Sequence, residues 1–292
     1  MKVCGFSFIR NGVLYDYPFE EAIRSILPLC DEVIVAVGRS EDETLEKVKA
    51  ISPKIKILET VWDETALKGG RNLAIETDKA FQSIPAEYDW AFYIQGDEVV
   101  HEKDYPAIRE AMEKYMHDPE VDGLLFNYHH FFGSYDHIAT QYSWYRREVR
   151  IIRNNKIFYS NRDAQGFKKP PGKTKLLVKP LDAFIYHYGW VRDPVAMQQK
   201  IKANIHVHKG DKIEDHVNEM NKKVHDYTAD RQPVKKFKGS HPALMKERIQ
   251  SMHWEYQPDT SLKYASAKDW IKRTIFRFTR WYPGEFKNYK II

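Results

Sequence analysis

Runs of apolar residues alternate with amphipathic stretches along the N-terminal third of the chain. Four runs, residues 3–9, 32–37, 54–59 and 89–94, predict strands, most of them apolar enough to be buried on both faces of a sheet. Between them, apolar residues recur at helical spacing in residues 19–29, from residue 44 and in residues 73–80. Strands joined by single helices pair in parallel through right-handed crossovers. The pattern therefore predicts a parallel α/β sheet whose carboxyl ends meet at one edge.

The pattern changes after a predicted helix at residues 105–116. Residues 123–132 and 142–152 are long, aromatic-rich extended runs with no helix between them, so we expect antiparallel strands added to the sheet. Shorter strands are predicted at residues 156–159, 175–178 and 183–188. Helical spacing dominates from Asp193, with helices predicted at residues 195–208 and 213–227, and others after Pro242 and Ala267. This predicts a mixed sheet flanked by helices in residues 1–192 and a mostly helical extension in residues 193–292.

The composition is that of a globular protein with a substantial core, since 42% of the 292 residues are hydrophobic and 30% are charged. A net charge of +5 suits anionic ligands but does not by itself indicate nucleic acid, and we expect none. Cys4 and Cys30 lie in apolar runs, which predicts buried thiols and a reducing, cytoplasmic location. Neither a signal peptide nor a membrane-spanning segment is expected.

Carboxylates follow the fourth predicted strand directly. The apolar run ends at Gly96, and Asp97 and Glu98 come next. Ligands of open α/β sheets bind beyond the carboxyl ends of strands, where such acids can hold a metal ion and, through it, a phosphate. A solvated acidic turn is the alternative. The other strand ends and helix starts carry Arg10, Ser40, Asp42 and Arg71, which we expect to converge with Asp97 and Glu98.

Four segments, residues 8–11, 38–44, 70–74 and 95–98, occur in an order that resembles the family 2 glycosyltransferases with the GT-A fold. The resemblance covers roughly residues 1–190 and implies a domain that binds a nucleotide-diphosphate sugar and transfers the sugar. It implies a cell-surface glycan or a lipid-linked molecule as the acceptor. It also implies a divalent cation, Mn²⁺ or Mg²⁺. It assigns the donor site to Arg10, Gly38, Ser40, Asp42, Arg71, Gln95 and Asp97.

The chain departs from the family pattern at two places. Where the family has Asp-x-Asp, this chain has Gln95-Gly96-Asp97, so the first carboxylate is absent. The resemblance then leaves Asp97 as a metal ligand, with His187 in the place of a downstream histidine ligand; a packed strand histidine is the alternative. Gly38-Arg39-Ser40 replaces the family's paired aspartates that contact uracil, so the nucleotide stays open.

Sugar transfer needs a stabilised diphosphate leaving group and, with inversion, a base that takes the proton of the acceptor hydroxyl. By its position, Asp163 resembles the residue that acts as the base in the family, and Asp136 is a second candidate. Alternatively, Asp163 belongs to an ordinary turn. Glu98 is the other catalytic candidate. Aromatic residues that could stack on sugar rings or pack in the core are Trp144, Tyr145, Phe167 and Trp190.

Two further segments combine basic or histidine residues with aromatic ones. His129 and His130 are neighbours on a predicted strand and face opposite ways, so we do not expect them to share a metal. Residues 270–282 interleave basic and aromatic side chains. They could contact an anionic membrane peripherally, at the inner face, near a lipid-linked acceptor; we favour packing of their aromatic side on the sheet domain.

Two other functions compete with sugar transfer. A sugar-phosphate nucleotidyltransferase shares the α/β plan, but its glycine-rich, arginine-containing first loop is missing after Ile9. A non-catalytic, basic and aromatic module that binds anionic glycan or RNA is the third hypothesis. The sequence shows no P-loop, no Gly-x-Gly-x-x-Gly turn, no Gly-x-Ser-x-Gly elbow and no Cys/His zinc spacing.

Overall fold

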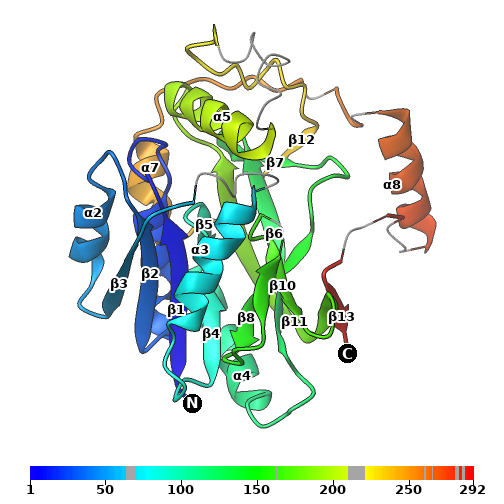
Figure 1. Ribbon diagram of the computed structural model, residues 1–292. Coiled ribbons are helices and arrows are strands. Elements are labelled where there is room, and N and C mark those ends of the chain that lie inside the picture. Colours follow the sequence, from blue (N-terminus) through cyan, green and yellow to red (C-terminus); the bar gives the residue numbers. More distant parts are fainter. Residues whose placement is uncertain are drawn as a thin grey trace.

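The computed structural model describes residues 1–63, 70–161, 163–209, 221–259, 261–264, 266–279, 283–284 and 287–292. Four parallel strands form one half of its sheet. The strands are β1 (Val3–Ile9), β2 (Glu32–Gly38), β3 (Ile55–Thr60) and β4 (Trp90–Tyr93), and they lie in the order β3-β2-β1-β4 (Figure 1). The predicted parallel half is therefore confirmed.

The other half of the sheet is mixed. β8 (Arg147–Arg153) runs antiparallel to β4, β6 (Gly123–Phe132) runs antiparallel to β8, and β11 (Thr174–Trp190) runs parallel to β6. The predicted antiparallel addition is confirmed, although the run from residue 142 becomes a strand only at Arg147. The two strands predicted at residues 175–178 and 183–188 are parts of the single long strand β11.

Several short strands were not predicted, because three to six residues give little periodic signal. They are β5 (Glu98–Val100), β7 (Ser134–Ala139), β10 (Gly166–Lys169), β12 (Val234–Lys236) and β13 (Tyr289–Ile291). The strand expected at residues 156–159 corresponds to β9 (Tyr159–Asn161), which begins only at Tyr159. β12 pairs with β7 and β13 pairs with β11, so residues beyond 192 add strands to the same sheet.

Most predicted helices are present with small shifts at their ends. They are α1 (Phe19–Ile26), α2 (Thr44–Ile51), α3 (Arg71–Gln82), α4 (Tyr105–Lys114), α5 (Pro194–Lys209), α7 (Lys246–Gln250) and α8 (Ala267–Thr279), with 3-10 turns η1 (Leu27–Leu29), η4 (Glu102–Asp104) and η6 (Ala243–Met245). Of the helix predicted at 213–227, residues 213–220 lie outside the described residues. Its described end, 222–227, is not helical.

The core has two layers, one on each face of the parallel strands. Val33, Val35 and Val37 of β2 belong to the cluster that contains buried residues of α1 and α4. Ile34 and Ala36 belong to the cluster on the opposite face, which α3 covers. Successive side chains of β2 therefore point to opposite faces of the sheet, and both faces are buried. This is why the sequence of β2 is a continuous apolar run.

The strand order places a site at a defined position. β2 lies on one side of β1 and β4 lies on the other, so the strand order reverses at β1. At such a reversal a crevice forms outside the carboxyl ends of the strands. α5 lies over these ends (Figure 1). The predicted mixed α/β sheet flanked by helices is confirmed. Cys4 and Cys30 are buried free thiols, and no described helix is both long and apolar enough to span a bilayer.

Candidate active site

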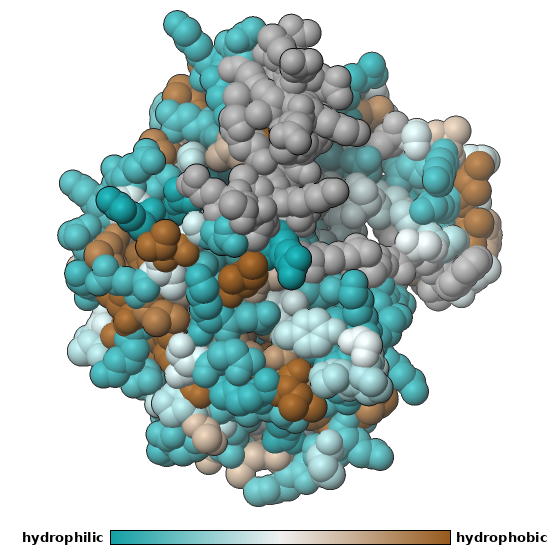
Figure 2. Space-filling model, in the orientation of Figure 1, coloured by the Kyte–Doolittle hydropathy of each residue, from teal (hydrophilic) through white to brown (hydrophobic). Residues whose placement is uncertain are grey.

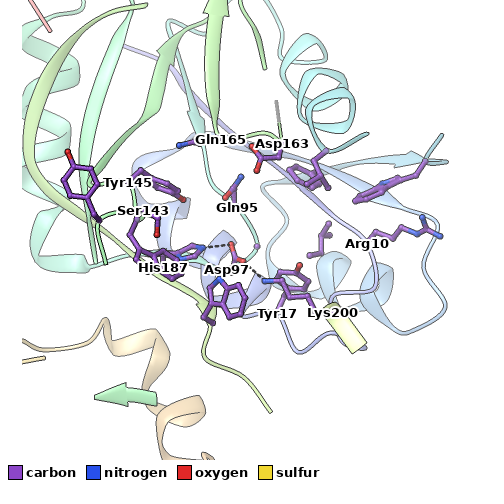
Figure 3. A pocket seen from close by; sticks show the side chains of 18 of the residues that line it. Arg10, Tyr17, Gln95, Asp97, Ser143, Tyr145, Asp163, Gln165, His187 and Lys200 are labelled. Carbon is purple, nitrogen blue, oxygen red and sulfur yellow. Dashed lines mark ion pairs between the residues drawn. The ribbon is translucent and has the colours of Figure 1, made fainter. Parts of the chain in front are cut away.

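A cavity of about 620 Å³ opens at the carboxyl ends of β1 and β4. Its walls come from segments far apart in sequence: the end of β1, the turn after β4, the loop before β8, the loop between β9 and β10, the end of β11, and α5. Figure 3 shows the polar side chains that line it, among them Arg10, Tyr17, Gln95, Asp97, Asp163, Gln165, His187 and Lys200.

Asp97 is the charged centre of one wall. Its Oδ1 lies 3.8 Å from Nε2 of His187, and its Oδ2 lies 3.5 Å from Nζ of Lys200 and 3.8 Å from Nη2 of Arg192 (Figure 3). Burial by itself would raise the pKa of Asp97, but the positive charges of these neighbours outweigh it and lower the pKa. Asp97 is therefore an ionised carboxylate beside two cationic side chains.

Gly189 on β11 allows this cluster to form. A Cβ atom at this position would lie 2.6 Å from Nε2 of His187 and 2.8 Å from Oδ2 of Asp97, too close for any side chain. Its carbonyl oxygen also accepts hydrogen bonds from Lys200 Nζ at 2.9 Å and from Arg192 Nη2 at 3.1 Å. The glycine thus gives Asp97 and His187 their space and holds both cations in place.

The two cations have different environments. Arg192 is fully buried, donates from Nη1 to the carbonyl of Tyr15 at 2.6 Å, and lies 4.3 Å from the ring centre of Tyr17. Lys200 lines the cavity from α5. Burial, together with the charge of Arg192, lowers the pKa of Lys200 to about 7. Arg192 therefore anchors the loop after β1, whereas Lys200 faces the cavity.

His187 has a defined tautomer because of His130. Nε2 of His130 lies 2.6 Å from the carbonyl oxygen of Tyr145, which can only accept, so this nitrogen carries the proton. Burial lowers the pKa of His130 well below 6.5, so the ring is neutral and its Nδ1 is an acceptor. His187 Nδ1, at 3.1 Å, must then be the donor. In neutral His187 this leaves a lone pair on Nε2, beside Asp97.

The opposite wall carries Asp163. Nε2 of Gln95 donates to the carbonyl of Ala164 at 3.0 Å and to the hydroxyl of Tyr93 at 3.2 Å, so it ties this loop to the end of β4. Ala164 has a left-handed backbone (φ 64°), which turns the chain beside Asp163. Asp163 is exposed and lines the cavity across from Asp97 (Figure 3).

A buried carboxyl stands behind this wall. Gln165, which lines the cavity, donates from Nε2 to Oε1 of Glu148 at 2.9 Å. Asn288 donates to Oε2 of Glu148 at 3.0 Å, so the C-terminal segment contributes to the support of the wall. Burial raises the pKa of Glu148 to about 7.

Aromatic side chains complete the cavity. Trp144, Tyr145 and Trp190 line it, as proposed from the sequence. Phe167 does not, because its ring packs in the core against Phe6, Phe81 and Tyr93. Trp62 also lines the cavity, and the missing side chain of Gly38 gives it room, since a Cβ there would lie 2.3 Å from its Nε1.

Some of the predicted site residues lie away from the cavity. Ser40 accepts from the backbone of Asn11 at 3.0 Å, and Asp42 accepts from Leu14 at 2.7 Å and from Thr44, so both shape the loop after β1. Arg71 is exposed at the start of α3. Asp136 is exposed on β7. None of these four lines the cavity.

Glu98 is placed beneath the site rather than in it. It is fully buried and paired with Arg150 through two hydrogen bonds, and it accepts a third from Tyr128 at 2.8 Å. Oε2 also accepts from the backbone nitrogen of Gln95 at 3.2 Å. Its carboxylate supports the turn that carries Asp97 and does not reach the cavity, which argues against a catalytic role.

The C-terminal helix reaches the rim. Lys272 lines the cavity, and Phe276 lies under the guanidinium of Arg146 at 4.7 Å. The expectation that the aromatic side packs on the sheet is wrong for the rest of α8, where Trp270, Ile271 and Phe278 are 50%, 50% and 79% exposed. Residues 280–282 of this predicted segment lie outside the described residues. Figure 2 shows hydrophobic residues along the outer edge of this helix.

No family profile matches the sequence, and no curated protein matches it. Similar solved structures include residues 1–349 of S. aureus TarS in complex with UDP-GlcNAc, at 15% identity over 73% of this chain and 69% of that chain, with a TM-score of 0.39. Glucosyl-3-phosphoglycerate synthase from Mycobacterium tuberculosis, with Mn²⁺, UDP and phosphoglyceric acid, is 16% identical over 44% and 43% of the chains (TM-score 0.30).

A third similar structure is the 4-diphosphocytidyl-2C-methyl-D-erythritol synthase of Anaerococcus prevotii. It is 10% identical over 52% of this chain and 71% of that chain, with a TM-score of 0.33. At these identities and TM-scores, the similarities say nothing about the reaction of this chain.

Proposed function

We propose that this chain is a glycosyltransferase that moves a sugar from a nucleotide-diphosphate donor to a glycan or lipid-linked acceptor. One observation carries the proposal: the cavity at the strand reversal has a cationic wall around Lys200 and a carboxylate, Asp163, on the facing wall. Its volume of about 620 Å³ is in the range of small-molecule sites. The motif resemblance of residues 8–11 and 95–98 agrees with this function.

The donor would lie along the floor formed by β1 and the turn after β4. Its diphosphate would lie against Lys200, the cation that α5 presents to the cavity. Phe8 and Trp62 line the other end, and the Arg10 guanidinium lies 5.5 Å from the Trp62 ring centre. This aromatic and cationic end suits a nucleobase and its ribose.

Asp163 is our candidate for the base. In an inverting transfer, the acceptor oxygen attacks the anomeric carbon and the bond from that carbon to the phosphate oxygen breaks. The hydroxyl proton passes to the carboxylate of Asp163, and the nucleoside diphosphate leaves with the electron pair. Asp163 is suited to this step because it is exposed and lines the cavity, and Trp144 and Trp190 line the same cavity, where they could hold sugar rings.

The residues of the cationic wall do not match a divalent-cation site. Oδ1 of Asp97 and Nε2 of His187 are the two candidate ligands, 3.8 Å apart, but the second Asp97 oxygen faces Lys200 and Arg192. With Lys200 protonated, the group formed by Asp97, Lys200 and Arg192 has a net positive charge. With Lys200 neutral, the charges of Asp97 and Arg192 cancel. Among the described residues, no three His, Cys, Asp or Glu side chains form a group that could hold a metal. The described residues therefore do not fit the predicted Mn²⁺ or Mg²⁺ ion.

The position of α8 supports a lipid-linked acceptor. One side of the helix reaches the cavity rim through Lys272, while Trp270, Ile271 and Phe278 are exposed on the other. An amphipathic helix with basic residues and exposed aromatic rings suits the surface of an anionic membrane. The proposal places the enzyme in the cytoplasm with α8 against the inner face of a membrane, so that a lipid-linked acceptor would enter beside Lys272.

The proposal is tested by incubating the protein with UDP-, GDP-, CDP- and ADP-sugars and measuring release of the nucleoside diphosphate. We expect slow donor hydrolysis with one nucleotide, and its loss in Asp163→Asn, which lacks the candidate base. A nucleotidyltransferase would instead release pyrophosphate from a nucleoside triphosphate and a sugar phosphate. Absence of nucleotide binding in a thermal-shift screen would contradict both enzymes, because a ligand at 100 times its dissociation constant stabilises a protein by about 2.7 kcal/mol.

A further inference from the structure

We propose that Lys200 supplies the cation for the diphosphate leaving group, so that this site binds a nucleoside diphosphate without a divalent metal. The inference rests on the proposed function and names the group that recognises the donor. It starts from the juxtaposition of Lys200, Arg192 and Asp97 within 4 Å at one wall of the cavity.

Asp97 faces two cationic side chains. A carboxylate that binds a metal in water-exposed surroundings offers its oxygens to the ion. Here one oxygen, Oδ2, lies 3.5 Å from the ammonium of Lys200 and 3.8 Å from the guanidinium of Arg192. A divalent cation at Asp97 would be repelled by both groups at short range. The same two groups attract an anion.

Of the two cations beside Asp97, Lys200 is the one that is available to a ligand. Arg192 is fully buried and donates to the carbonyls of Tyr15 and Gly189. The ammonium of Lys200 has three donors, and within the described part of the chain it contacts the Gly189 carbonyl and Asp97. Because Lys200 lines the cavity, its third donor can reach a phosphate oxygen there.

The surroundings also hold Lys200 in one position. Its ammonium lies 5.0 Å from the ring centre of Tyr17, and the Gly189 carbonyl fixes it at 2.9 Å. A fixed cation stabilises the charge that develops on the leaving diphosphate without reorganisation during the reaction. Asp97 then has a structural role: it orients the ammonium and partly balances it while the site is empty of ligand.

The experiment is calorimetric titration with inorganic pyrophosphate and with ADP, CDP, GDP and UDP, in EDTA and again with Mn²⁺. We expect one nucleoside diphosphate to bind in EDTA with an affinity that Mn²⁺ changes little. Lys200→Met should weaken this binding about tenfold or more, because a charge-assisted hydrogen bond is lost. Lys200→Arg should retain most of it.

Lys202→Met is the matched control, since Lys202 is two residues further along α5 and does not line the cavity; its binding should equal that of the unmodified protein. Binding that requires Mn²⁺ in the unmodified protein would overturn the inference and leave the proposed function intact. If no nucleoside diphosphate binds with or without Mn²⁺, the proposed function itself fails. The comparison of EDTA with Mn²⁺ uses the unmodified chain. It therefore shows whether binding needs a divalent metal even if Lys200→Met does not fold.

Discussion

The guanidinium of Arg150 donates to both carboxylate oxygens of Glu98, from Nη2 to Oε1 at 2.7 Å and from Nε to Oε2 at 2.8 Å, and both side chains are fully buried. This pair lies under the turn that carries Gln95 and Asp97. Since Oε2 also accepts from the backbone of Gln95, the pair connects the sheet to the cationic wall of the site.

Replacing one partner of this pair should destabilise the protein strongly. Glu98→Ala leaves a buried, unpaired guanidinium, and we expect a loss of about 3–5 kcal/mol in the free energy of unfolding, measured by urea denaturation. Glu110→Ala, an exposed position on α4, should change it by less than about 0.5 kcal/mol. Normal stability of Glu98→Ala together with lost activity would instead indicate a direct catalytic role for Glu98.

His130 should fix the protonation of His187. In neutral rings, imidazole nitrogen NMR is expected to show the His187 proton on Nδ1 and no proton on Nε2. In His130→Phe the acceptor is lost, so the two tautomers of His187 should mix, while affinity for the nucleoside diphosphate changes little. His129→Phe is the control, because His129 stacks on Phe184 on the other face of the strand. A proton on Nε2 in the unmodified protein would refute this account.

Binding of a nucleoside diphosphate should weaken above neutral pH. The pKa of Lys200 is lowered to about 7, so its ammonium is present below this pH and is lost above it. Between pH 7 and 8.5 the diphosphate is already fully ionised, since its last pKa is about 6, and affinity should fall by up to about tenfold per pH unit. Lys200→Arg stays charged throughout, so its profile should be flat. Identical profiles for the two proteins would contradict the role of Lys200.

The outer face of α8 should mediate binding to anionic vesicles. Replacing Trp270 and Phe278 with serine removes two exposed aromatic side chains, and we expect partition onto phosphatidylglycerol vesicles to fall about tenfold or more in a sedimentation assay. Ile157→Ser, which removes a side chain of similar exposure (52%) in the turn before β9, is the control. Equal partition of both variants would exclude α8 as the membrane contact.

Much of the fold could be predicted from the sequence, because its parallel half consists of long runs buried on both faces and helices with clear spacing. β1 and β2 match their predicted ranges almost residue for residue. The short strands β12 and β13 could not be predicted, since three residues have no period and their pairing with β7 and β11 depends on the tertiary structure.

The site was predicted in part. Arg10, Gln95, Asp97, Asp163 and His187 all line one cavity, because each lies near the end of a strand or in a loop at the same edge. Lys200 and Arg192 were missed. Both come from the region after β11, where a lysine on a helix looks like an ordinary solvated charge until the structure shows that α5 lies across the strand ends.

The central claim is that the cavity between Lys200 and Asp163 holds the diphosphate of a nucleotide-sugar donor. The most direct measurement is a crystal structure of the protein with the nucleoside diphosphate that gives the largest thermal shift. We predict a phosphate oxygen within hydrogen-bond distance of Lys200 Nζ and the base beside Trp62. Density for the nucleotide outside this cavity, or phosphates directed away from Lys200, would contradict the account.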